Sequence, residues 1–410
     1  MPTHIKNVLI LAISQALFTS TTSMMITIGG LVGYKLAENK ALATLPFSMV
    51  IVGLAVSTIP ASLLMRRVGR RTGFLIGSAM GATAALLNAL AVYHGSFWML
   101  ALGALLAGVY GAFGQLYRFA AVDSTPLHFQ SRAISFVLAG GLLAGFMGPQ
   151  IAKWSREWME VIYVGNYVAI AMLAASSLLF LVFLDIPKPK AEDLQGPQRP
   201  ILKIMLQPVF LVAAFSAMVG YAVMALIMTG TPLAMVAYDF AFNDAATVIQ
   251  WHVVAMFLPS FFTGSIILRI GVLRVIMLGV LLNAACIVIA LSGTSMLNFW
   301  LALSLLGVGW NFMFIGGTTL LTRAYTVAER PKAQAANDFM VFGSQALASL
   351  SAGPLLYLLG WEMVVWTGVP FVVMAGLATL WLAMRQGVDP APVSLGQQEP
   401  GSPVPASVGG

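Results

Sequence analysis

The chain has 410 residues, of which 59% are hydrophobic and 9% are charged. Soluble domains are about 45–50% apolar and about 25% charged, so this composition excludes a water-soluble fold and predicts an all-α membrane protein. The net charge of +7 is spread over many loops, which argues against a nucleic-acid partner, and the single cysteine, Cys286, excludes a disulfide framework.

Twelve hydrophobic stretches follow one another along the chain, and each is close to the ~20 residues that a helix needs to cross ~30 Å of hydrocarbon. The first six lie at 8–32, 43–64, 72–93, 97–119, 133–152 and 161–184. The second six lie at 209–235, 248–268, 273–292, 297–321, 338–359 and 364–384. We therefore predict twelve transmembrane helices.

The two sets of six stretches are related in sequence. A shift of 205 residues places Arg118 on Arg323 and Pro149 on Pro354, and other positions match at nearly the same offset. Such a series indicates a duplicated six-helix unit, which is typical of secondary transporters that bind their substrate between two halves. The predicted parts are an N-terminal half at 1–185, a cytoplasmic linker at 186–204, a C-terminal half at 205–385 and a disordered tail at 386–410.

The basic residues predict the orientation in the lipid bilayer. With both termini in the cytoplasm, only four of the 21 Lys and Arg residues fall in outer loops, namely Lys35, Lys40, Lys153 and Arg156, and the other seventeen fall in inner loops. This asymmetry follows the positive-inside rule. The sequence thus predicts a multi-pass protein with cytoplasmic termini.

Two motifs resemble the major facilitator superfamily. The segment SLLMRRVGRR at 62–71 is similar to the loop between the second and third helices of that family, and GLLAGFMGP at 141–149 is similar to the Gly-Pro motif of its fifth helix. The resemblance implies two six-helix pseudo-repeats, alternating access and a monomer. Where the family has Gly and Asp in the loop, this chain has Ser62 and Arg66, so the acidic member of the family's gate is missing. We assign Arg67, Gly69, Arg70, Arg118 and Arg323 to gating or topology.

The sequence contains no motif that is typical of an enzyme active site. It has no phosphate-binding Gly-x-x-x-x-Gly-Lys-Ser/Thr loop and no recognisable nucleophile–base arrangement, and we expect no permanently bound cofactor. Nearly all charges lie near the ends of the predicted spans, and no carboxylate is expected at mid-membrane. This pattern argues against a carboxylate proton relay and against drug efflux through an acidic cavity.

Methionine and histidine side chains recur at helical spacing in two consecutive spans. Met224 and Met228 share one helix face, as do His252 and Met256 on the next helix, and Met235 is a possible additional ligand. The two pairs are predicted at similar depth in the outer half of the membrane. Thioethers and imidazole suit Cu(I), although methionine is also a common packing residue.

The pattern of Met224 and Met228 followed by His252 and Met256 resembles that of the CcoA-like copper importers of proteobacteria, which are major facilitator proteins. The resemblance implies that copper is the transported substrate and that the chain imports it across the bacterial inner membrane. Because that group is close to predicted riboflavin transporters, uptake of a neutral planar organic compound such as riboflavin stays open, with drug efflux as a third possibility. The side chains proposed for an organic substrate are Gln15, Asn88, Trp310 and Asn311.

Overall fold

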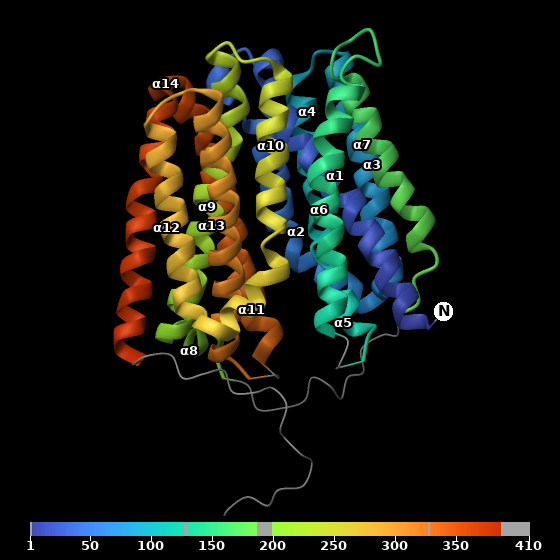
Figure 1. The fold of residues 1–410 in the computed structure, drawn as a ribbon. Coiled ribbons are helices and arrows are strands. Elements are labelled where there is room, and N and C mark those ends of the chain that lie inside the picture. The colour runs from blue at the N-terminus through green and yellow to red at the C-terminus, as the bar shows by residue number, and fades with distance from the viewer. Residues whose placement is uncertain (1, 127–129, 187–198, 327–328, 387–410) are drawn as a thin grey trace, which may run out of the picture.

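The computed structural model describes residues 2–126, 130–186, 199–326 and 329–386, and within these ranges the regular structure is helical. The N-terminus and the last residues of α14 lie at the same end of the helix bundle, which we call the inner end (Figure 1). The predicted tail at 386–410 lies outside the described residues except for its first residue. Most of the predicted linker at 186–204 also lies outside them, and its described end begins the short helix α8 (Ile201–Met205).

The first half of the bundle contains six long helices and one short one. They are α1 (Thr3–Leu36), α2 (Leu45–Val68), α3 (Arg70–Tyr93), α4 (Phe97–Gly114), α5 (Tyr117–Asp123), α6 (Gln130–Ser155) and α7 (Val164–Leu181), with the 3-10 turn η1 (Lys40–Leu42) before α2. The predicted span at 97–119 is therefore interrupted between α4 and α5. The Ser96 hydroxyl accepts a hydrogen bond from the Met99 amide and so caps the start of α4.

The second half repeats this arrangement. After α8 it contains α9 (Pro208–Ala237), α10 (Phe242–Phe257), α11 (Ser260–Ile270), α12 (Val272–Leu291), α13 (Met296–Leu321), the 3-10 turn η4 (Thr322–Ala324) and α14 (Arg330–Gln386). Gly69 turns the chain between α2 and α3 with φ 91° and ψ 163°, and Gly271 turns it between α11 and α12 with φ 88° and ψ 154°. The two glycines are 202 residues apart, and only glycine adopts this conformation without strain. The halves therefore share a backbone feature as well as a sequence pattern.

The helix α14 contains two spans. Its 57 residues would extend about 85 Å if they were straight, far more than the ~30 Å of hydrocarbon. Non-helical backbone at Gly360, with φ 82°, divides it between the predicted spans at 338–359 and 364–384. Among the described residues nine helices are long and apolar enough to cross a membrane, counting α14 once, and α10 with α11 makes a tenth. The second part of α14 and the 26-residue α6 complete the predicted twelve.

The eighth span is bent, which corrects the prediction of one continuous helix at 248–268. The axes of α10 and α11 differ by 42°. Pro259 lies at the break, and because proline has no amide hydrogen it cannot continue the hydrogen-bond ladder of α10. The break lets α11 take its own direction toward the inner end (Figure 1).

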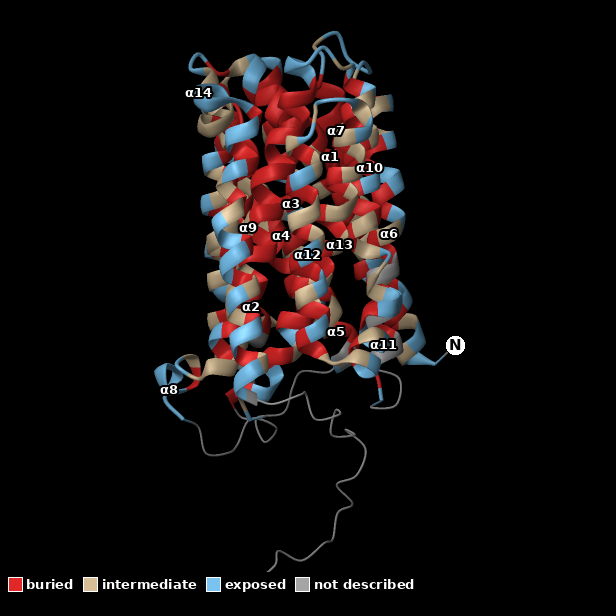
Figure 2. Cartoon of the chain, turned by 60° about the vertical axis from the view of Figure 1, so that its left-hand side comes forward, coloured by how far each residue is buried: buried red, intermediate tan, exposed pale blue. Residues whose placement is uncertain are grey.

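Buried residues fill the inside of the bundle, and exposed residues cover its outer surface (Figure 2). Many of the exposed side chains are large and apolar, for example Leu63, Trp98, Leu179 and Leu347. A continuous apolar surface of this kind fits a lipid environment, because a soluble protein rarely exposes so many large apolar side chains.

The two halves touch near the outer end. The hydroxyl of Ser48 on α2 lies 2.8 Å from that of Ser349 on α14, and the Gln150 amide on α6 donates to Gln250 on α10 over 2.7 Å. A side chain added at Gly353 would meet the hydroxyl oxygen of Thr44 at 2.4 Å, so the helices are in close contact there as well. The structure therefore has its outer end closed.

Candidate functional site

A cavity of about 510 Å³ lies between the two halves. Most of its lining residues belong to α1, α2 and α4 in the first half and to α9, α10, α13 and α14 in the second, and α3, α5, α7 and α11 contribute one or two each. The lining includes Gln115 and Thr319, which lie near the ends of α4 and α13 that face the inner end. The cavity thus reaches from the middle of the bundle toward the inner end, while contacts between the halves close the outer end.

Aromatic rings form the wall that belongs to the second half. Trp310 and Phe314 stack with an interplanar angle of 15° and centroids 5.4 Å apart. Tyr221 meets both rings edge-on, at 5.2 and 4.9 Å, and Phe342 lies 5.7 Å from Tyr221. The Trp310 indole nitrogen is buried and makes no hydrogen bond among the described residues. This wall therefore offers flat apolar faces and an N–H donor.

The polar residues of α1 line the opposite side of the cavity. Gln15, one of the residues proposed for an organic substrate, is among them, and its side-chain amide donates to the Thr19 hydroxyl over 2.9 Å. The Thr21 and Thr22 hydroxyls donate to the backbone carbonyl of Phe18 within the same helix. Such bonds satisfy the hydroxyl protons and leave oxygen lone pairs as acceptors toward the cavity.

Two charged side chains of opposite sign line the cavity, Arg118 and Asp338. The sequence predicts Asp338 as the first residue of a span. The helix α14 begins earlier, at Arg330, so Asp338 lies about 12 Å along the helix from its start. Arg118, predicted at the cytoplasmic surface, faces the cavity because the cavity reaches the inner end.

Three of the predicted copper ligands face the cavity. Met224, Met228 and Met256 all line it, whereas Met235 is fully buried and is not among the lining residues. Met228 lies about 13 Å below the outer end of α9, and Met256 lies about 21 Å below the start of α10 at Phe242. The two methionine positions therefore differ in depth more than the sequence predicted, since α10 begins six residues before the predicted span.

His252 is not among the lining residues of the cavity. It is fully buried against α13, where its Nδ1 is 2.7 Å from the carbonyl oxygen of Leu303. Because a carbonyl only accepts, Nδ1 carries the proton, and Nε2 makes no hydrogen bond among the described residues. Gly307 allows this close packing, since a side chain there would meet the His252 carbonyl at 2.7 Å. Three of the four predicted ligands therefore line the cavity, and the fourth, His252, packs against α13.

The two asparagines proposed for an organic substrate have different positions. Asn311 lines the cavity, but its amide donates to the Met256 carbonyl and the Ser260 hydroxyl, and its carbonyl accepts from Thr263. It thereby links α13 to both sides of the break between α10 and α11. Asn88 is fully buried on α3 against Gly103 of α4 and is not a lining residue.

The remaining basic candidates lie at the inner end. Arg70 donates from Nε and Nη2 to one carboxylate oxygen of Asp123, at 3.1 and 2.8 Å, and so joins the start of α3 to the end of α5. Arg67 is the second-last residue of α2 and Arg323 lies in η4, and both are exposed. Gly69 provides the turn described above. These positions fit a role in the loops at the inner end rather than in the cavity.

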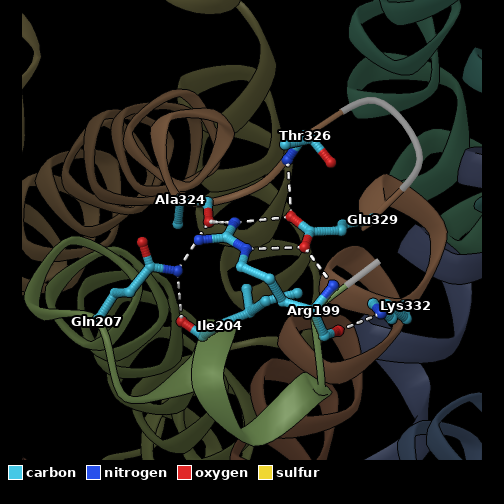
Figure 3. Close-up of polar contacts among 7 residues, drawn as sticks. All are labelled: Arg199, Ile204, Gln207, Ala324, Thr326, Glu329 and Lys332. Atoms are coloured by element: carbon cyan, nitrogen blue, oxygen red, sulfur yellow. Dashed lines mark hydrogen bonds and ion pairs between the residues drawn. The ribbon is translucent and has the colours of Figure 1, made fainter. Parts of the chain in front are cut away.

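A second ion pair at the inner end joins a half-exposed arginine to a buried glutamate (Figure 3). Arg199, just before α8, donates from Nε and Nη2 to the two oxygens of Glu329, each over 2.7 Å, and Nη2 also donates to the Ala324 carbonyl. The Glu329 side chain is 1% exposed. These hydrogen bonds, with one from the Thr326 amide, hold the pKa of Glu329 well below its usual range. The pair connects the end of the linker to the turn before α14.

Comparison with known proteins places these features in a family. Residues 9–258 match the family model described as the Major Facilitator Superfamily. The chain is 42% identical over 372 residues to the riboflavin transporter RfnT of Brucella anthropi, an alignment covering 90% of this chain and 94% of the relative. It is 28% identical to the uncharacterized MFS-type transporter YdeG of Bacillus subtilis, covering 88% and 92% of the two chains. It is also 27% identical to YddS, another uncharacterized MFS-type transporter of Bacillus subtilis, covering 85% and 84%.

Proposed function

The chain belongs to the major facilitator superfamily, and we propose that its substrate within this family of transporters is riboflavin or a closely similar planar, neutral heterocycle. The observation that carries the proposal is the cavity with its aromatic wall, in a chain that is 42% identical to a riboflavin transporter over nearly its whole length. We further propose the bacterial inner membrane as its location and uptake as its direction, with both termini in the cytoplasm because of the basic inner loops.

The cavity supports this substrate class by size and by chemistry. A volume of about 510 Å³ falls within the range of about 300–1,000 Å³ found for small-molecule sites. A tricyclic ring packs favourably against Trp310, Phe314 and Tyr221 in stacked or edge-on geometry. A hydroxylated side chain would find amides at Gln15 and Gln345.

Copper is the competing substrate, and the observation in its favour is that three thioethers line the cavity. Against it, His252 packs on α13, and the lining that contains the methionines also includes several aromatic rings that an ion does not need. None of the three similarities reported above concerns copper. We therefore treat Met224, Met228 and Met256 as apolar lining, which is a common use of methionine.

An uptake assay in a host that lacks its own riboflavin and copper transporters separates the two substrates. We would measure labelled riboflavin and cellular copper with the wild-type chain and with Met224→Leu, at equal amounts of protein in the membrane. Since leucine and methionine have similar volume, we expect Met224→Leu to keep riboflavin uptake within about threefold of the wild type.

The assay has two decisive outcomes. Riboflavin accumulation that persists in Met224→Leu supports the proposal. Copper accumulation that disappears in Met224→Leu and in His252→Ala, without any riboflavin signal, overturns it and makes these residues ligands.

A further inference from the structure

The lining of the cavity contains two charged side chains among the described residues, and they come from different halves. Arg118 lies in α5 of the first half and Asp338 in α14 of the second. Both side chains face the same cavity, which lies between the two halves. The formal charge of the lining is therefore zero.

The pair lies at the edge of the aromatic wall. The Arg118 guanidinium carbon is 5.8 Å from the centroid of the Phe314 ring, which stacks on Trp310. Asp338 accepts a hydrogen bond of 3.1 Å from the Asn337 amide and lies one helical turn before Phe342. A ligand ring that packs on Trp310 thus has a cation close to the adjoining Phe314 ring and a carboxylate in the same cavity lining.

This balance of charge matters for a ligand that carries a phosphate. A phosphate monoester brings a charge of about −1.5 to −2 at neutral pH. In the cavity it would meet one guanidinium whose charge is balanced by a carboxylate of the same lining, so part of its charge would be desolvated without compensation. An uncharged ligand of the same shape carries no such penalty.

We infer that the Arg118–Asp338 pair makes the cavity selective for the uncharged heterocycle and excludes its phosphate monoester. The inference rests on the proposed function and names the discriminating residues of the same site. Asp338 excludes the phosphate by repulsion and by offsetting the positive charge of Arg118 in the lining. Removal of the carboxylate leaves a positive lining that attracts a phosphate, whereas removal of the guanidinium leaves a negative lining that repels it more strongly.

The test measures binding of riboflavin and of riboflavin 5′-phosphate to the purified chain, from the quenching of flavin fluorescence. For the wild type we expect the phosphate to bind at least about tenfold more weakly, since the penalty is that of an uncompensated charge. Asp338→Asn should reduce the ratio of the Kd of riboflavin 5′-phosphate to the Kd of riboflavin at least about threefold, and Arg118→Gln should increase this ratio. Asp123→Asn is the matched control, because it removes an equal charge at the inner end outside the cavity, and it should leave the ratio unchanged.

The outcomes separate this inference from the proposed function. Equal binding of both flavins to the wild type overturns the inference and leaves the proposed function standing, whereas binding of neither flavin overturns both. An unchanged ratio in Asp338→Asn also overturns the inference. If that variant does not elute as a folded protein, Arg118→Gln decides alone, because only a charge mechanism predicts that its ratio rises.

Discussion

Trp310 combines a ring face and an N–H donor at the centre of the aromatic wall. Its loss removes a ring contact worth about 0.5–1.5 kcal/mol, which corresponds to about a 2- to 12-fold weaker affinity. We therefore expect Trp310→Leu to raise the riboflavin Kd by that factor. The Kd of Trp310→Phe should lie between the values of the wild type and of Trp310→Leu. The same titration on Trp366→Leu is the control, because Trp366 is 52% exposed on the outside of the bundle. Equal Kd values for all variants would contradict a substrate site at Trp310.

At the scale of single residues, the sequence predicted which side chains are buried better than it predicted which way they face. His252 and Met256 are four residues apart and differ by only about 40° around the helix. This difference is enough to place Met256 on the cavity and His252 on α13. Side-chain direction at such a boundary depends on the neighbouring helix, here on the space left by Gly307, and helical spacing contains no information about that neighbour.

The contact between Arg199 and Glu329 joins two elements of the inner end, and its energetics depend on pH. The folded-state pKa of Glu329 is depressed, so its contribution to stability is complete above the ordinary carboxyl pKa of about 4.3 and is lost as the pH falls below that value. We expect Glu329→Gln to lower the Tm of the purified protein at pH 7 and the deficit to shrink as the pH falls below about 4.

The control for this experiment is Asp123→Asn, which breaks the more exposed ion pair with Arg70. The Asp123 side chain is 36% exposed, against 1% for Glu329, so water screens its charge and its loss should change the Tm less. A Glu329→Gln variant with the wild-type Tm at pH 7 would show that the contact does not stabilise the fold.

At the scale of helices, the span positions were predictable and the irregularities were not. Hydropathy located the predicted stretches because each must cover the hydrocarbon core. The break at Pro259 could be expected from the sequence, because proline has no amide hydrogen to continue the helical hydrogen bonds. The residue of α13 that binds both sides of the break could not be expected. Asn311 stabilises the break from α13, 55 residues after the carbonyl that it binds. The start of α14 was missed because Arg330 and Lys332 are polar and hydropathy assigns such residues to a loop.

For the whole molecule, the repeat in the sequence predicted the architecture, because two copies of a six-helix unit leave an interface between them. Which end of that interface is closed could not be predicted from the repeat. Closure at the outer end depends on small side chains meeting across the halves, such as Ser48 with Ser349. Alternating access requires these contacts to separate during transport.

A pair of engineered disulfides tests this movement, starting from Cys286→Ser to remove the single cysteine. The hydroxyl oxygens of Ser48 and Ser349 are 2.8 Å apart across the halves, and those of Ser78 and Ser177 are 2.8 Å apart between α3 and α7 of the first half. Cysteines at either pair can approach disulfide geometry, in which Cβ atoms are about 3.5–4.5 Å apart. We expect oxidation of Ser48→Cys/Ser349→Cys to reduce uptake at least about tenfold, because the outer end can no longer open, and we expect uptake to recover when the disulfide is reduced.

Oxidation of Ser78→Cys/Ser177→Cys should leave uptake near its reduced value, since that bond lies inside one half. Both bonds replace a serine contact of equal length, so the comparison isolates whether the bond crosses the interface. Equal loss in both variants would indicate damage to the helices rather than a locked state. Full uptake with the bond between residues 48 and 349 formed would mean that the outer end does not need to open there, and that the two halves do not move as units.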